Sequence, residues 1–217
     1  MDVPELILSF GKHLLRQDLT RCILVCKSWH RVLAPLIYHT VQDLGQGKRP
    51  SVRAVERYGQ HIRSLHLSME DFRRVTLYRG SFRSHRCHNL QELVLYVHKN
   101  AEDPHQEWYI ADMVMRNAGL LRLVVNGNDV LLYSWRTWSS ILLEHGLALR
   151  DISFHKVCLS RESMAAIFAF GPRLCKLELI ACEKETTLDD PILFTSNPQF
   201  PNLTEFSMDD FGGVFDL

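Results

Sequence analysis

The sequence lacks several features that would place it at once in a functional class. No apolar run approaches the roughly 20 residues that a membrane-spanning helix needs. The first five residues, Met1 to Glu5, lack the basic flank and apolar core of a secretory signal. Basic and acidic side chains balance at 25 each. We therefore expect no membrane contact, and the neutral overall charge argues against a nucleic-acid partner.

Catalytic and metal-binding patterns are also missing. The sequence contains no glycine-rich phosphate-binding motif, no nucleophile paired with a base and no carboxylate pair in a predicted pocket. Two histidines and a cysteine occur in the segment 85–88, but no second pair of ligands follows at the spacing of a structural zinc site. We predict that the protein is not an enzyme, binds no cofactor or metal and takes no small-molecule substrate.

Cysteines number only six, and several lie inside apolar periodic stretches, where a free cysteine behaves as a small hydrophobic residue. We expect Cys175 and Cys182 to be structural rather than reactive. Disulfides are not expected in such a chain, so a reducing compartment, cytoplasmic and/or nuclear, is predicted.

Charge is divided unevenly along the chain. Residues 1–100 carry 16 basic and 8 acidic side chains, whereas residues 101–217 carry 9 and 17. Such an asymmetry indicates partner surfaces rather than architecture. Arginines recur from Arg73 to Arg86 with Tyr78 and Phe82 between them, which we interpret as a solvated loop. A nucleic-acid-binding segment is the alternative interpretation.

The first forty residues predict three short helices. Apolar residues recur at helical spacing from Val3, and the first helix is expected to end near Leu14 or Leu15. The second helix opens at Asp18, and the third runs from about Lys27, with Pro35 forbidding its continuation. Three helices of this size cannot bury all of their apolar side chains, so these must pack on the rest of the chain or on a partner.

Three segments of this region resemble an F-box, a motif that typically begins Leu-Pro-x-Glu and later reads Val-Cys-(Lys/Arg)-x-Trp. They are Val3–Ile7, Asp18–Trp29 and Leu33–Tyr38, and the resemblance covers roughly residues 2–41. The Cys-x-x-Val-Cys-Lys-x-Trp portion is its most specific part. The chain departs from the pattern where Val3 replaces Leu, where one residue is missing after Pro4, and where Tyr38 stands in place of a common Trp.

The resemblance implies a helical unit that docks on the Skp-type adaptor of a cullin-based ubiquitin ligase. It implies that seven residues make this contact or support it: Pro4, Leu6, Ile7, Leu14, Leu19, Val25 and Trp29. Aliphatic and aromatic anchors of this kind dominate interface energetics. The alternative is that they form the core of a helical cap on the remaining chain.

A six-residue pattern, apolar-x-x-apolar-x-apolar, recurs through the rest of the sequence. Its copies begin 25 to 30 residues apart and comprise Ile62–Leu67, Leu90–Leu95, Leu120–Val125, Leu149–Phe154, Leu174–Leu179 and Leu203–Met208. This pattern is that of leucine-rich repeats, and the spacing is typical of one strand and one helix in each repeat. Helices are expected at 52–58, 110–118, 138–145 and 163–170.

In a stacked parallel sheet, the first, fourth and sixth residues of each copy would point into the core and the others to a concave face. That face would bind a target protein through Ser64, His66, Glu92, Val94, Arg122, Val124, Asp151, Ser153, Lys176 and Glu178, with Glu205 and Ser207 at its end. The alternative for any one of these residues is a merely solvated position.

The predicted fold class is therefore α/β, with an F-box-like helical domain at 1–44 and a leucine-rich-repeat solenoid of about six degenerate repeats at 45–217. The sequence stops soon after the sixth copy, so we expect either an incomplete array or a cover formed by residues 211–217. The predicted function is the substrate-recognition subunit of a Skp–cullin–F-box ligase, with the adaptor, and through it the cullin, and a target protein as partners. A repeat scaffold without a ligase role is the alternative.

Overall fold

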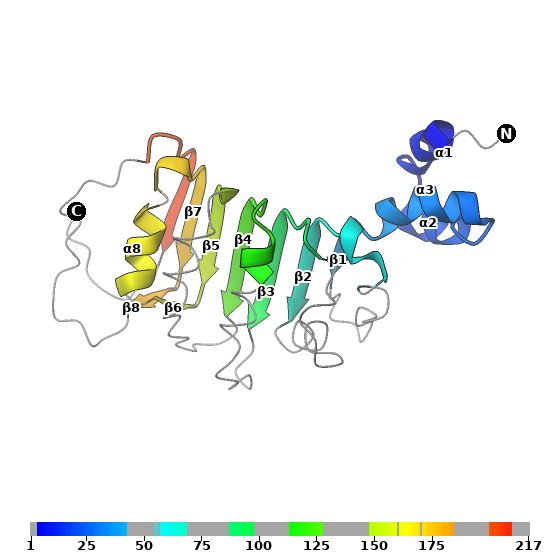
Figure 1. Ribbon diagram of the computed structural model, residues 1–217. Coiled ribbons are helices and arrows are strands. Elements are labelled where there is room, and N and C mark those ends of the chain that lie inside the picture. The colour runs from blue at the N-terminus through cyan, green and yellow to red at the C-terminus, as the bar shows by residue number, and fades with distance from the viewer. Residues whose placement is uncertain are drawn as a thin grey trace.

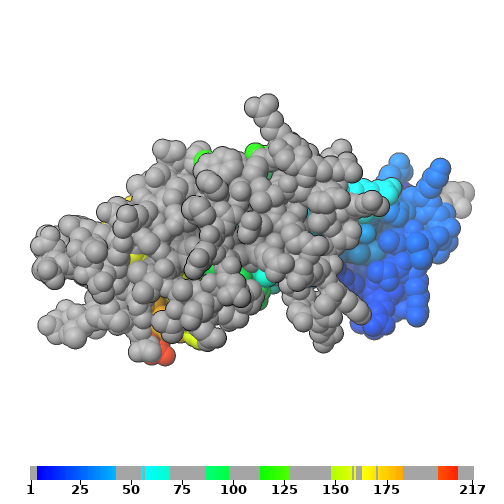
Figure 2. All heavy atoms as spheres, turned by 90° about the horizontal axis from the view of Figure 1, so that it is seen from below, coloured from blue at the N-terminus to red at the C-terminus, as the bar shows by residue number. Residues whose placement is uncertain are grey.

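The computed structural model describes residues 4–42, 55, 57–68, 87–97, 113–127, 148–159, 161–169, 171–184 and 200–209. It is an elongated α/β structure in which three helices stand at one end of a long sheet (Figure 1). The N-terminal part is seen at one end of the molecule in Figure 2. The helices are α1 (Pro4–Gly11), α2 (Arg16–Cys22) and α3 (Lys27–Ile37). We refer to these helices and their connecting turns, residues 4–38, as the helical unit.

The sheet contains seven parallel strands that follow one another in chain order. They are β1 (Thr40–Gln42), β2 (Ser64–Ser68), β3 (Glu92–Val97), β4 (Arg122–Gly127), β5 (Asp151–His155), β7 (Lys176–Ile180) and β9 (Glu205–Asp209). The six strands expected from the repeated pattern are thus confirmed, and equivalent positions of successive copies lie side by side, as Leu65, Leu93 and Leu123 do. β1 was not predicted, and it places the start of the sheet inside the range 1–44 assigned to the helical domain.

One apolar core runs behind the sheet. The first, fourth and sixth residues of the first five copies are all buried to 3% exposure or less, as expected. The sixth copy differs, because Phe206 at the end of the sheet is 58% exposed, while Leu203 and Met208 are only partly buried against the core. Residues 211–217, expected as one possible cover for this end, lie outside the described part of the chain.

The backbone repeats the same contact before almost every strand. Arg63 and Ser64 both donate their N–H groups to the carbonyl of His39, at 2.9 and 3.0 Å. In the same way, the second residue of each of the first five copies accepts N–H groups from the second and third residues of the next copy; these acceptors are the carbonyls of Arg63, Gln91, Leu121, Arg150 and Cys175. The starts of adjacent strands are therefore tied together by backbone as well as by side-chain packing.

The helical unit differs from expectation at two helix ends. α1 ends at Gly11 rather than near Leu14. α3 lies close against this end, since a Cβ at Gly11 would overlap the side chain of the fully buried Leu33. α3 continues past Pro35 to Ile37. A proline removes one helical hydrogen bond, but Leu33 and Ile37 are buried on either side of it, and their packing holds the last turn.

Shorter elements complete the described structure. The predicted helix at 163–170 is confirmed as α8 (Arg161–Ala169), which contributes to the sheet's core through Met164 and Ile167. The 3₁₀ turns η1 (Gly59–His61) and η4 (Gly171–Arg173) precede β2 and β7, and a small second sheet pairs β6 (Cys158–Leu159) with β8 (Glu183–Lys184). Within the predicted helix at 52–58, the described residues Val55 and 57–58 are helical. Within the one at 110–118, residues 113–116 are helical. The predicted helix at 138–145 lies outside the described residues.

Candidate functional site

Apolar side chains remain exposed on the helical unit. Its core buries Ile7, Leu19, Leu33 and Ile37. Outside this core, Leu6 is 68% exposed on α1, and Leu24 and Val25 are 81% and 69% exposed in the turn between α2 and α3. Phe10 and Leu15 are also exposed. So many exposed large apolar residues on so small a unit are typical of a surface that binds another protein.

The seven residues implied as adaptor contacts fall into three groups. Pro4, Leu6 and Val25 are exposed, so they are available to a partner. Ile7 and Leu19 are buried in the core of the helical unit and can only support such a contact. Leu14 and Trp29 are partly buried against that core.

Trp29 links the buried and exposed parts of the helical unit. Its ring meets that of Phe10 edge to face, with centroids 6.2 Å apart, and it also packs against the core. Aromatic pairs of this geometry contribute about 0.5–1.5 kcal/mol beyond their buried area. Trp29 therefore holds α1 against α3 and orients the exposed Phe10.

Sequence reasoning missed the exposure of Leu15 and Leu24. Both follow apolar neighbours in the chain, so composition alone places them in a core. Leu15 has an extended backbone and directly precedes α2, and Leu24 lies in the turn that follows α2. Leu24 lies five residues after the buried Leu19 and so misses the three- and four-residue spacing of buried positions, but Leu15 lies four residues before Leu19 and its spacing gives no such signal.

The second candidate surface is the face of the sheet opposite its core, which we call the open face. Three rows of side chains cross it, because residues of parallel strands alternate between faces and successive strands are in register. The row nearest the strand starts reads Thr40, Ser64, Glu92, Arg122, Asp151, Lys176 and Glu205. From Glu92 onward its charges alternate in sign, which places opposite charges on neighbouring strands.

A polar cluster occupies the β2–β4 part of the open face. Ser64 donates to Glu92 at 2.5 Å, and Arg122 donates to the other carboxylate oxygen at 3.0 Å. Nε2 of His66 lies 2.9 Å from the Ser64 hydroxyl and 3.1 Å from Glu92. Burial disfavours the charged form of Glu92, but the hydrogen bonds from Ser64 and His66, with the charges of His66 and Arg122, outweigh it and hold its pKa below the usual value.

These three residue types also make up hydrolase triads, but their arrangement here is different. In a triad the acid holds one ring nitrogen of the histidine and the serine meets the other. Here Ser64 and Glu92 both approach Nε2 of His66, and Nδ1 lies 3.5 Å from the side-chain amide of Gln42. The serine hydroxyl donates to the carboxylate of Glu92, and the cluster joins side chains of β2, β3 and β4.

A second cluster lies on β5, β7 and β9. Ser153 donates to Glu178 at 2.7 Å, and Lys176 contacts Glu178 at 2.9 Å and Glu205 at 2.7 Å. His155 lies 3.8 Å from Glu178. The hydrogen bond from Ser153 is the main cause that lowers the pKa of Glu178; burial opposes it, and Lys176 adds to it.

Not all of the residues predicted for target binding are accessible. Ser64, Val94, Val124 and Ser153 are buried, so they serve the sheet itself rather than a ligand. The others reach the surface at least in part, as His66, Glu92, Arg122, Asp151, Lys176 and Glu178 do. The alternation of the sequence pattern predicted that these side chains share one face of the sheet. It could not predict which of them are buried, because burial depends on the side chains of adjacent strands.

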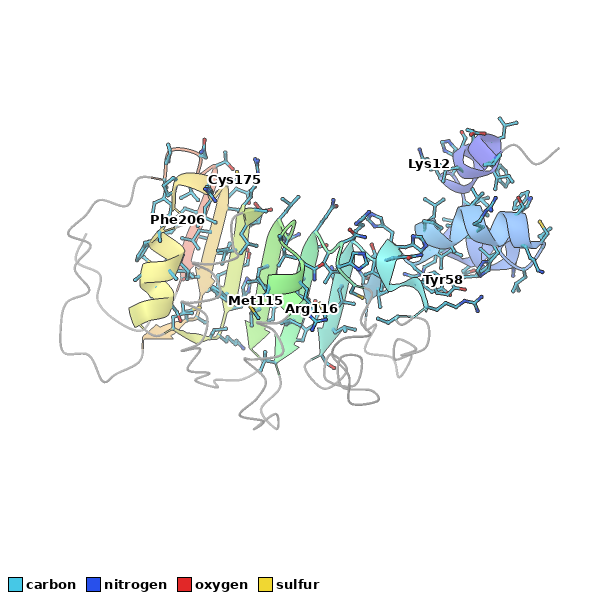
Figure 3. The ribbon with its side chains drawn as sticks, viewed as in Figure 1. Lys12, Tyr58, Met115, Arg116, Cys175 and Phe206 are labelled. Atoms are coloured by element: carbon cyan, nitrogen blue, oxygen red, sulfur yellow. The ribbon has the colours of Figure 1, made fainter. Side chains whose placement is uncertain are left out.

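The helical unit and the sheet meet at an aromatic joint. The rings of Tyr38 and Tyr58 stack with centroids 4.0 Å apart and planes 9° from parallel. The hydroxyl of Tyr58 lies 2.8 Å from Nε2 of His30 on α3. Burial, followed by the neighbouring Tyr58, raises the pKa of Tyr38. Tyr58 is seen between the helices and the first strands in Figure 3.

Other expectations fall partly outside the described residues. Arg73 to Arg86 lies wholly outside them, as does His85 of the segment 85–88. Cys87 is buried, which raises its pKa to about 12, and His88 is exposed. Within the described ranges, no group of three or more potential ligands is placed to hold a metal. Cys182 is buried, and its Sγ lies 3.1 Å from the carbonyl of Phe154, in keeping with a structural role.

Comparison of the sequence with protein-family models and with curated proteins found no match. Among the helices that the structure describes, none is both long and apolar enough to cross a bilayer.

Proposed function

We propose that this chain is a non-catalytic adaptor of the F-box and leucine-rich-repeat type. In this proposal the helical unit docks on the Skp-type adaptor of a cullin-based ubiquitin ligase, and the sheet-bearing part holds a target protein. The target would then reach the ligase at high effective concentration. The observation that carries the proposal is the exposure of Leu6, Leu24 and Val25 on a helical unit with a core of its own.

Two further observations support the repeat part of the proposal. Six copies of one apolar pattern lie in register, and paired backbone hydrogen bonds recur between successive copies. Stacking of similar units, each in contact only with its neighbours, is the architecture of leucine-rich-repeat solenoids. The open face offers charged side chains in fixed positions for a target protein.

The exposed residues give a direct test of adaptor docking. A variant with Leu6→Ser and Val25→Ser should lose at least tenfold in affinity for a purified Skp-type adaptor, because truncated apolar anchors each remove roughly 1–2 kcal/mol of binding energy. Both side chains are exposed, so the fold should survive, as circular dichroism would show. Affinity is measured by isothermal titration calorimetry.

Leu121→Ser is the matched control, since it removes an exposed leucine from the sheet-bearing part. It should bind the adaptor as the unaltered chain does. Failure of the unaltered chain to bind, or equal losses in the control, would show that the helical unit is not an adaptor-docking module.

A scaffold without a ligase role is the second candidate, and the aromatic joint favours it. Stacking of Tyr38 on Tyr58 and the direct passage from α3 into β1 are what a helical cap on the sheet requires. Removing residues 1–25 deletes α1 and α2 but keeps β1. Loss of the cooperative thermal transition of the remaining chain would favour the cap, whereas a folded remainder would favour a docking module.

A further inference from the structure

The last strand of the sheet exposes an apolar side chain at a position that the earlier copies bury. Phe206 of β9 is 58% exposed. The equivalent residues of the first five copies are each exposed by 1% or less: Leu65, Leu93, Leu123, Ile152 and Leu177. Figure 3 labels Phe206 at the end of the sheet away from the helical unit. β9 therefore has the apolar pattern of a strand with two neighbours, but β7 is its only partner among the described strands.

Backbone groups of β9 also point away from β7, and we call this side of residues 204–209 the β9 edge. Glu205 and Asp209 use backbone groups toward the β7 side, in bonds of 3.1 and 2.7 Å. Successive residues of a strand bond to opposite sides, so the N–H and carbonyl groups of Phe206 and Met208 face outward. In each earlier copy the carbonyl of the second residue accepts from the next copy. In the sixth copy this residue is Thr204, and no N–H of the described residues bonds to its carbonyl.

The β9 edge is held in place before any partner binds. Asn202, in the turn before β9, donates to the carbonyl of Pro172 at 2.7 Å. The ring of Phe200 meets that of Phe168 on α8 edge to face, with centroids 6.0 Å apart. A preformed strand loses little conformational freedom on binding, which favours the addition of another strand.

The charges on the open face indicate which kind of strand fits. In the row nearest the strand starts they alternate in sign from β3 to β9 and end on Glu205. The next member of this row would be basic and would lie beside Glu205, whose side chain is 64% exposed although Lys176 contacts it from β7. Asp209 is exposed on the same face, and within the described ranges no cation pairs with it. A strand with a basic residue near each end gains from both carboxylates.

A second copy of the chain fits this edge less well. Two β9 strands that pair about a two-fold axis and keep their cores on one side run antiparallel. The register that brings Phe206 of one copy beside Met208 of the other also places Glu205 opposite Asp209. Like charges directly opposite each other destabilise a strand pair. Charge complementarity therefore favours a different, basic chain.

We propose that the β9 edge binds an extended basic segment of a partner protein by strand addition. The segment follows the pattern basic–apolar–polar–apolar–basic, which is the same in either strand direction. Its basic residues lie beside Glu205 and Asp209, and its apolar residues cover Phe206 and Met208. Its backbone supplies the hydrogen-bond partners that the edge lacks. The site lies at the opposite end of the sheet from the helical unit, so it does not depend on adaptor docking (Figure 1).

The test uses the full chain and a fluorescein-labelled peptide with the central sequence Lys-Leu-Ser-Leu-Lys. Fluorescence anisotropy should show at least tenfold tighter binding of this peptide than of one with glutamate in place of both lysines. Phe206→Ser should weaken binding at least tenfold, and so should Glu205→Gln combined with Asp209→Asn. All three residues are exposed, so circular dichroism should show an unchanged fold.

Two control variants match these changes. Leu121→Ser removes an exposed apolar side chain from the segment before β4, and Glu5→Gln combined with Asp18→Asn removes two carboxylates from the helical unit. Both should change the affinity less than twofold. Adaptor affinity, measured separately, should not change in Phe206→Ser.

Equal losses in the controls would overturn the proposal, and so would equal binding of a peptide with the same residues in the order Leu-Lys-Lys-Leu-Ser. Light scattering could instead show a dimer of the unaltered chain that Phe206→Ser dissociates, which would assign the β9 edge to a second copy. Peptide binding that becomes tenfold tighter when residues 211–217 are removed would assign the edge to that segment. Either result would replace the proposed partner.

Discussion

A single buried amide, Asn117, joins three parts of the chain. Its Oδ1 accepts the N–H of Leu90 at 2.8 Å, and its Nδ2 donates to the carbonyls of Cys87 and Met113 at 3.1 and 2.7 Å. The side chain is only 1% exposed. Buried backbone N–H and carbonyl groups need hydrogen-bond partners, and here the side chain of Asn117 supplies them in place of water. The residue therefore links the turn before the third copy, Leu120–Val125, to the start of the second, Leu90–Leu95.

Asn117→Ala should lower the free energy of unfolding by roughly 2–4 kcal/mol, because it leaves an N–H and two carbonyls without this partner. Asn202→Ala is the control: it also removes an amide bonded to a carbonyl in the preceding turn, but Asn202 is exposed. Its cost should be below about 1 kcal/mol. Urea unfolding followed by circular dichroism measures both, and equal costs would show that burial of Asn117 is not what matters.

At the scale of elements, polar and charged side chains pair between adjacent strands. β5 and β7 are joined by Ser153 and Glu178, and β7 and β9 by Lys176 and Glu205. In a parallel in-register sheet, equal charges at one position would repel along the whole row. Alternation in sign removes this repulsion without any change in the apolar pattern behind the sheet.

The lowered pKa of Glu178 predicts that part of the stability is lost in acid. Because the folded-state pKa lies below the ordinary value of 4.5, ionised Glu178 stabilises the fold above about pH 4.5, and this contribution is lost as the pH falls through the folded-state pKa. Glu178→Gln should therefore reduce stability at pH 7 and flatten its decline below pH 4.5.

Ser153→Ala removes the hydrogen bond that contributes most to this lowered pKa and should flatten the decline in the same way. Urea unfolding at a series of pH values from 7 to 3 measures the slope. Parallel curves for the variants and the unaltered chain would show that Glu178 does not carry the effect.

At the scale of the whole molecule, the aromatic joint lies between the helical unit and the sheet. The helical unit and the sheet have separate apolar clusters, one around Leu33 and one around the strands. Between them stand the stacked rings of Tyr38 and Tyr58 and the contact of Tyr58 with His30. If the helical unit docks on one partner and the sheet on another, this joint sets the distance between the two partners.

Tyr58→Ala should loosen the helical unit without unfolding the sheet. Loss of the stacked pair and of the contact with His30 should make amide hydrogen exchange in α3 about tenfold faster, which corresponds to about 1.4 kcal/mol. Exchange in β4 and β5 should not change. Tyr58→Phe keeps the ring and loses only the hydroxyl, so its effect should be smaller; equal effects of the two variants would show that the stack contributes nothing.

Much of the sheet was predictable because each strand shows its buried face in the order of a few neighbouring residues. A strand with one face in the core alternates apolar and polar residues, so Leu90 to Leu95 already indicates which side chains point inward. β1 escaped prediction because it has only three residues, and Val41 alone shows the alternation. Pro35 was misread because a local rule ends the helix there, while the burial of Leu33 and Ile37 sustains it.

The segment from Asp18 to Trp29 separates what the sequence determines by itself from what depends on the tertiary structure. Its apolar spacing determined that it folds into short helices with more apolar surface than they can bury. Only the packing of α1 and α2 on α3 decided that Leu19 is covered while Leu24 and Val25 face solvent. A hollow lined by Leu121, Arg150 and Arg173 likewise exists only after stacking, since these residues come from turns that are distant in the chain and that backbone bonds between successive copies hold together. Local periodicity sets which face a residue takes, but exposure depends on neighbours that only the folded chain supplies.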